Sequence, residues 1–172
     1  MSVIDIFIYT IPAFLVFLTS ILTIRYFIRD NQKQRKMEIL LENQKIVTPI
    51  KLQAYERITL FLERITPDSL IMRVMNPKMN CAQFQAELLR TIRAEFEHNL
   101  SQQIYISPKA WEIVKNSKEQ VIKIVNIAFT KVKPADPAMR LSQQIIEKMV
   151  DIQKAPTHAA IEFLKEELKS VI

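Results

Sequence analysis

The chain has 172 residues, which is enough for one domain of ordinary size. It contains no glycine, whereas an average chain of this length has roughly a dozen, so Gly-rich phosphate loops and a G-x-S-x-G elbow are excluded. The single cysteine, Cys81, excludes an intrachain disulfide, and the formal net charge is +6, from 24 Lys and Arg against 18 Asp and Glu.

Residues 6–24 form a run of 19 residues without a charge. As a helix this run spans about 28 Å, close to the roughly 30 Å of a bilayer core. The chain start has no basic n-region, and no A-x-A-like cleavage site follows, so an anchor is favoured over a cleaved signal peptide. The sequence predicts a transmembrane anchor over residues 1–29. Its representative residues are Ile6, Pro12, Phe14, Leu18 and Ile24.

The charges after this run predict its orientation. Five basic residues follow it, opposed by Asp30 alone: Arg25, Arg29, Lys33, Arg35 and Lys36. Because Lys and Arg stay on the cytoplasmic side, we expect the N-terminus outside and the bulk of the chain in the cytoplasm. The run contains three hydroxyl side chains, those of Thr19, Ser20 and Thr23. They can hydrogen-bond either to a neighbouring helix, which we favour, or to backbone carbonyls of their own helix.

Residues 30–48 are predicted to form a juxtamembrane helix or linker, with Met37, Leu40 and Leu41 on one stripe. Thr48-Pro49 has the pattern of an N-cap followed by proline at the first helical position, so a new helix is expected from residue 49. Residues 49–172 then form a helical cytoplasmic domain. The first helix of this domain has an apolar stripe at helical spacing that comprises Ala54, Tyr55, Ile58, Phe61, Leu62 and Ile65.

Similar start signals recur along the rest of the chain. Thr66-Pro67 and Ser107-Pro108 repeat the cap-and-proline pattern, Asn80 with Gln83 resembles a capping box, and Pro156 opens the last helix. Sustained alternation of apolar and polar residues is absent from the sequence. The predicted fold class is therefore all-α, with an N-terminal transmembrane helix followed by a cytoplasmic bundle of about six helices.

Two patterns suggest chemistry only weakly. Glu95 and His98 form one E-x-x-H, but carboxylate-bridged metal bundles need two such motifs and two further glutamates. Cys81 is expected at the first position of a helix, where a thiol pKa can fall, although a small, partly buried side chain is the favoured interpretation. We expect no metal, no cofactor, no catalytic residue and no enzymatic activity.

A dense polar stretch near the middle of the chain is the predicted interaction surface. Its candidate residues are Arg93, Glu97, His98, Asn99, Gln102 and Gln103. The alternative is an ordinary polar helix face that leads into a loop.

Two segments, 52–65 and 91–105, resemble an uncharacterised family of small bacterial proteins. The resemblance extends to about residue 130. It implies a single N-terminal membrane span and a helical cytoplasmic region, and it supports a location at the bacterial inner membrane. It implies no activity, cofactor or catalytic residue.

Together these patterns predict a membrane-anchored, non-enzymatic interaction or scaffold protein that serves as an accessory subunit of a membrane complex. The expected partners are the lipid bilayer and either another membrane protein or a second copy of the chain, with no small-molecule substrate. The alternative is electrostatic. Beyond residue 24 the chain has 24 basic and 17 acidic residues, a net charge of +7, which suits RNA on a ribosome or acidic lipid at the membrane surface.

Overall fold

The computed structural model describes residues 3–152 and 155–171, and it describes side chains for residues 14–152 and 155–169. These residues form six α-helices: α1 (Val3–Ile65), α2 (Pro67–Val74), α3 (Cys81–His98), α4 (Pro108–Phe129), α5 (Ala138–Asp151) and α6 (Pro156–Val171). A short 3-10 helix, η1 (Leu100–Ile104), joins α3 to α4. Within the described ranges the chain has no β-strand, so the all-α prediction is confirmed.

The transmembrane part of the fold prediction is wrong. In the described part of the chain, no helix combines the length and the apolarity needed to cross a membrane. The side chains of Ile6 and Pro12, which belong to the predicted anchor, lie outside the described residues.

The chain divides into two compact units, Met1–Val47 and Thr48–Ile172. The predicted helix start at Thr48-Pro49 is wrong, because α1 continues through both residues without interruption. Pro49 has no N–H, so the carbonyl of Lys45 lacks the usual i+4 hydrogen bond at this position.

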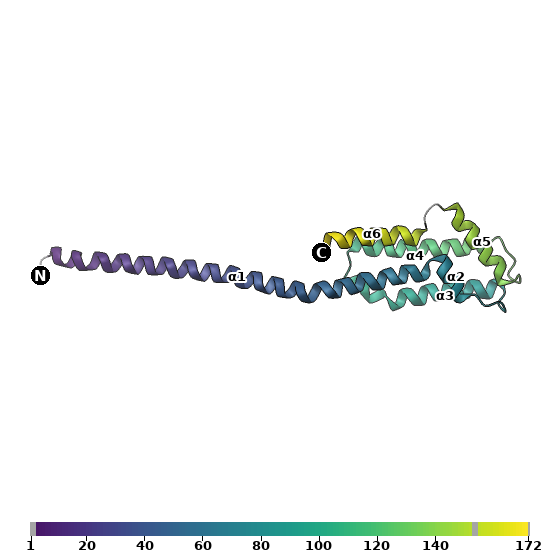
Figure 1. The fold of residues 1–172 in the computed structure, drawn as a ribbon, viewed down its shortest axis with the longest axis horizontal. Helices are drawn as coiled ribbons and strands as arrows, with labels where there is room; N and C mark the ends of the chain where they lie inside the picture. Colours follow the sequence, from purple (N-terminus) through teal and green to yellow (C-terminus); the bar gives the residue numbers. More distant parts are fainter. Residues whose placement is uncertain (1–2, 153–154, 172) are drawn as a thin grey trace. The chain divides into compact units, whose positions relative to one another are not determined.

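The second unit is a helical bundle (Figure 1). In it α4 packs against α3, α5 and α6, while α2 packs against α3 and α5. The apolar stripe predicted in the first helix of this unit is confirmed, because all six of its residues are buried. The largest side chains that are completely enclosed in the core include Ile58, Phe61, Leu62, Ile65, Phe84, Leu88, Ile92, Val114, Leu141, Ile145 and Leu164.

Most predicted helix starts are confirmed at the atomic level. The Asn80 side chain accepts a hydrogen bond from the Gln83 N–H at 2.9 Å, and the Gln83 side chain accepts one from the Asn80 N–H at 3.1 Å. This reciprocal pair is a capping box. Ser107 likewise accepts from the Ala110 N–H at 3.0 Å, ahead of Pro108. Helix α2 begins at Pro67 as predicted, although Thr66 makes no side-chain cap.

The linker before α5 completes the start of α3. The Cys81 N–H donates to the Asp136 carbonyl at 2.8 Å, and the Ala82 N–H donates to the Pro134 carbonyl at 3.1 Å. These are two of the first four N–H groups of α3, which have no acceptor within their own helix. A proline-rich loop thereby fixes α3 against α5.

Candidate interaction surface

The first unit has a series of exposed apolar side chains along α1. We call residues 14–47 the contact segment and divide it into an apolar block, 14–24, a basic block, 25–36, and a mixed block, 37–47. Phe14 and Phe17 of the apolar block are 64% and 63% exposed. Five consecutive residues, 14–18, are exposed and apolar, so the apolar surface extends around the helix.

The few polar side chains of the apolar block hydrogen-bond within the helix. The Ser20 hydroxyl donates to the Val16 carbonyl at 2.8 Å, and the Thr23 hydroxyl donates to the Thr19 carbonyl at 2.8 Å. Thr19 donates in the same way to Leu15 and Val16. Of the two alternatives that the sequence left open for these hydroxyls, the structure shows bonds to the backbone one turn earlier. Because these hydroxyls already bond to the backbone of their own helix, the block presents an apolar surface to a partner also at its Ser and Thr residues.

The basic block arranges most of its charge along one line of the helix. Arg25, Arg29, Lys33 and Lys36 are separated by four, four and three residues, the spacing that keeps side chains on one face. All four are exposed, as is Arg35, which lies on a different face. Asp30 is the only acidic residue here, and its carboxylate accepts a hydrogen bond from Gln34 at 3.4 Å. The result is a positively charged stripe directly after the apolar block.

The mixed block alternates charged and apolar residues. Met37, Leu40, Gln44 and Val47 follow each other at intervals of three or four residues and are exposed. Ile39 and Ile46 are exposed on another face. A helix with such a stripe normally packs it against another helix.

The residues predicted as an interaction surface in the bundle are only partly available. Arg93, Glu97, His98 and Gln103 are exposed, and Gln102 is half-buried. Asn99 is buried, and its side-chain amide donates to the Glu95 carbonyl at 2.8 Å, so it stabilises the end of α3. Three apolar residues on and beside η1 are also exposed, namely Leu100, Ile104 and Tyr105.

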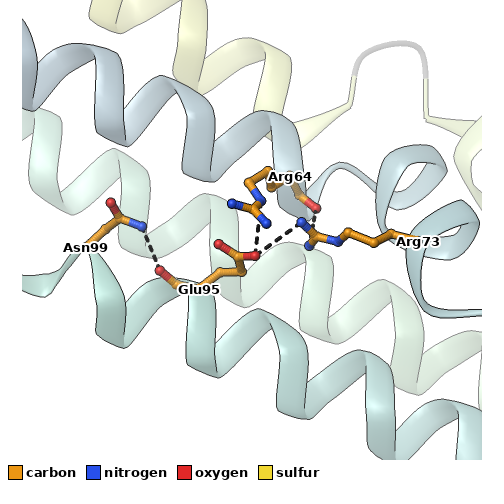
Figure 2. Close-up of polar contacts among 4 residues, drawn as sticks. All are labelled: Arg64, Arg73, Glu95 and Asn99. Atoms are coloured by element: carbon orange, nitrogen blue, oxygen red, sulfur yellow. Dashed lines mark hydrogen bonds and ion pairs between the residues drawn. The ribbon is translucent and has the colours of Figure 1, made fainter.

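Glu95 lies within this polar stretch but has a structural contact (Figure 2). One of its carboxylate oxygens lies 3.1 Å from the Arg64 Nε of α1 and 3.1 Å from the Arg73 Nη1 of α2. Arg73 also donates to the Arg64 carbonyl at 3.1 Å. The carboxylate of Glu95 thereby links three helices, and His98 is exposed one turn further on. The structure does not bring the E-x-x-H pair together as a metal site.

A second carboxylate, Glu167 of α6, was not predicted from the sequence. One of its oxygens accepts a hydrogen bond from the Tyr55 hydroxyl of α1, and the other accepts one from the Ser107 hydroxyl at 2.6 Å. Burial, and then the neighbouring Glu167 carboxylate, raise the pKa of Tyr55 above its ordinary value. Glu167 lies among several charged residues of α6, and nothing in the sequence distinguishes it from Glu162 or Glu166.

Cys81 begins α3, as predicted, and is fully enclosed. Its thiol donates to the Pro137 carbonyl at 3.3 Å. Burial raises the pKa of the Cys81 thiol, which is the opposite of the change that an activated nucleophile needs. Among the residues with described positions, no group of three His, Cys, Asp or Glu side chains is placed to hold a metal ion.

Helices α4 and α6 leave an uncharged surface groove between them, with a volume of about 400 Å³. The groove includes Ser117, whose buried hydroxyl has no hydrogen-bond partner among the residues that the structure describes. The other lining residues are Ile113, Asn116, Gln120, Pro156, Ala159, Ala160 and Phe163.

Comparison with known proteins places the chain in a family. No curated protein and no solved structure is significantly similar to this chain. One family model, described as a family of unknown function (DUF7935), matches residues 1–171. The resemblance to an uncharacterised family is thereby confirmed, whereas nothing in the match describes a membrane or a bacterial origin. Because the match covers nearly the whole sequence, the chain belongs to this family of unknown function, DUF7935.

Proposed function

We propose that this protein is a non-enzymatic interaction protein that uses the contact segment of α1 to bind its partners and carries the helical bundle as a module attached to that segment. The observation that supports the proposal is the set of apolar side chains exposed throughout residues 14–47. They include Phe14, Phe17, Leu22, Ile24, Leu40 and Val47.

The energetic reason is the cost of leaving this surface in water. Complete burial of one Leu, Ile or Phe side chain contributes about 1.5–3 kcal/mol. Monomeric proteins rarely expose a continuous apolar patch larger than a few hundred Å². A partner that covers even part of the contact segment therefore gains substantial free energy. Protein partners that fit the mixed block are an apolar helix of another subunit or a second copy of this chain.

A role without catalysis is supported by what the buried and partly buried polar groups of the bundle do. Glu95 and Glu167 each link elements that are distant in the sequence, and Asn99 stabilises a helix end. These groups are engaged in holding helices together. The exposed polar residues Arg93, Glu97, His98 and Gln103, next to Ile104, form a second surface that we propose for partner contact.

Measurement of the mass of the full chain in mild detergent by light scattering tests the proposal. We expect a complex larger than the 20.1 kDa single chain, formed with itself or with a co-purified subunit in fixed stoichiometry. The double variant Leu40→Glu, Val47→Glu should dissociate it, because two like charges are placed in the covered stripe.

The matched control places the same two charges on exposed apolar positions of the bundle, Leu60→Glu and Met72→Glu. This variant should keep the complex intact. A wild-type chain that is monomeric under all conditions would contradict the proposal. Equal dissociation by the control variant would also contradict it.

A second candidate function is contact with a polyanion, and the line of Arg25, Arg29, Lys33 and Lys36 favours it. Such binding weakens steeply as salt is added, because counterions compete for the same charges. Binding that salt does not change would exclude it. We also propose that the protein is an accessory subunit at the inner face of a bacterial membrane. This proposal rests on the family resemblance and on the positive charge of the basic block.

A further inference from the structure

We infer that the apolar and basic blocks of α1 together form a binding surface for acidic lipid, with the basic stripe among the headgroups and the apolar block in the adjoining acyl region. This inference rests on the proposed function, since it names one partner of the contact segment. It requires that residues 14–36 lie at a bilayer surface, and it does not require that they cross the bilayer.

The charge pattern gives the first argument. Arg25, Arg29, Lys33 and Lys36 project from one face of the helix, Arg35 adds a positive charge on another face, and Asp30 is the only acidic residue of the block. Five basic residues within twelve positions match the surface of a membrane that contains anionic lipid. Arg and Lys side chains also reach along a helix, so their charged groups can stay in the headgroup layer while their stems contact apolar surface.

The neighbouring apolar block favours lipid over nucleic acid. Phe14, Phe17 and Leu22 are exposed directly before the basic stripe, and Tyr26 and Phe27 are exposed within it. The hydroxyls of Thr19, Ser20 and Thr23 already bond to backbone carbonyls, so this block has few polar groups left to hydrate. A bilayer surface offers anionic headgroups beside an apolar layer, and it therefore complements both blocks at once. RNA complements only the basic block.

The junction between the apolar block and the basic block fits the same arrangement. Aromatic residues are favoured at the boundary between headgroups and acyl chains, and Tyr26 lies at this junction. The boundary of the bilayer should therefore lie near residues 24–26.

Flotation of the full chain with vesicles tests the inference. We expect binding to vesicles of phosphatidylcholine with phosphatidylglycerol and much weaker binding to phosphatidylcholine alone. A basic side chain near an acidic surface contributes about fivefold in affinity. The variant Arg25→Gln, Arg29→Gln, Lys33→Gln, Lys36→Gln should therefore lose about a hundredfold or more. Its helix content, measured by circular dichroism, should be unchanged, because these side chains are exposed.

The matched control removes four positive charges from exposed positions of the bundle and its loop, Lys115→Gln, Lys123→Gln, Lys131→Gln and Lys133→Gln. This control has the same net charge as the test variant and should keep nearly full affinity. Equal loss in both variants would show a general charge effect and overturn the inference. Equal binding of the wild-type chain to both kinds of vesicle would also overturn it.

A third variant separates lipid from RNA. Phe17→Ser with Leu22→Ser leaves every basic residue in place, so it should weaken vesicle binding while leaving any binding to polyuridylic acid unchanged. Tight, salt-dependent binding to polyuridylic acid without vesicle binding would overturn the inference in favour of a nucleic acid. If vesicle binding fails while Leu40→Glu, Val47→Glu still dissociates a protein complex, the lipid inference fails and the proposed function stands. If vesicle binding fails and Leu40→Glu, Val47→Glu dissociates no protein complex, both the lipid inference and the proposed function fail.

Discussion

The hydroxyl of Ser107 donates a hydrogen bond to the carboxylate of Glu167 at 2.6 Å, although 60 residues separate the two in the sequence. The same Ser107 oxygen accepts the Ala110 N–H and so caps α4. The other oxygen of Glu167 accepts the hydroxyl of Tyr55. Three helices, α1, α4 and α6, are thereby joined at one carboxylate.

Replacement of Glu167 should destabilise the bundle. Glu167→Ala leaves the hydroxyls of Tyr55 and Ser107 without their acceptor, and we expect the free energy of unfolding to fall by about 1–3 kcal/mol. Urea denaturation followed by circular dichroism measures this change. The control is Glu166→Ala, whose exposed carboxylate pairs with the exposed Lys169 one turn away in α6. A loss in the control as large as that in Glu167→Ala would contradict the assigned role.

The raised pKa of Tyr55 predicts a stability change in alkali. A phenol ionises at about pH 10 in the unfolded chain, whereas the folded chain holds the Tyr55 proton to higher pH. Above pH 10 the native state therefore binds more protons than the unfolded state, and stability falls as pH rises. Urea midpoints between about pH 8 and 11 should show this decline. Tyr55→Phe should reduce it, and an identical decline in Tyr55→Phe would exclude Tyr55 as the cause.

Two equally buried serines predict opposite responses to the same substitution. Ser117 and Ser142 are both 3% exposed, but the Ser117 hydroxyl has no hydrogen-bond partner within the described part of the chain, whereas the Ser142 hydroxyl donates to the Met139 carbonyl at 2.8 Å. In a helix interior, replacement of Ser by Ala stabilises the helix by about 0.5 kcal/mol at either site. Ser117→Ala should be more stable than the parent, and it should exceed Ser142→Ala by about 1 kcal/mol. Thermal denaturation decides this, since equal stabilities would show that Ser117 also has a hydrogen-bond partner in solution.

Cys81 should be inert in the folded protein. Its thiol is enclosed, and burial raises its pKa, so both access and thiolate fraction are low. Alkylation with iodoacetamide at neutral pH should be slow in the native state and fast in urea. Ala135→Cys provides a control thiol in the exposed loop, which should react quickly in both conditions. Fast alkylation of Cys81 in the native protein would contradict this prediction and would make Cys81 a candidate nucleophile.

The sequence predicts the bundle well where the signals are local. The apolar stripe from Ala54 to Ile65, the capping box at Asn80 and the start of α4 at Pro108 depend on residues three or four positions apart, and the structure confirms them. Leu100 is different. It continues the apolar spacing of α3, yet it is exposed, because α3 ends at His98 and the 3-10 turn changes the angle between successive side chains.

Contacts between residues that are distant in the sequence could not be predicted from local sequence patterns. Nothing local indicates that Glu167 meets Tyr55 and Ser107, or that Glu95 meets Arg64 and Arg73, because these pairs depend on how the helices pack. The helix start expected at Pro49 failed for a related reason. A cap-and-proline pattern lowers the cost of a start there, but it does not force one when the preceding residues already form a helix.

Cysteine labelling tests the central claim, that a partner covers the contact segment, most directly. Because Cys81 is enclosed, a second cysteine at Leu40→Cys or at Lys123→Cys can be labelled selectively with a permeant maleimide in cells that make the full chain at its natural level. Both positions are exposed in the isolated chain. The account predicts that Leu40→Cys is protected in cells and reacts after denaturation, while Lys123→Cys reacts at once. Equal, rapid labelling of both positions in cells would contradict it.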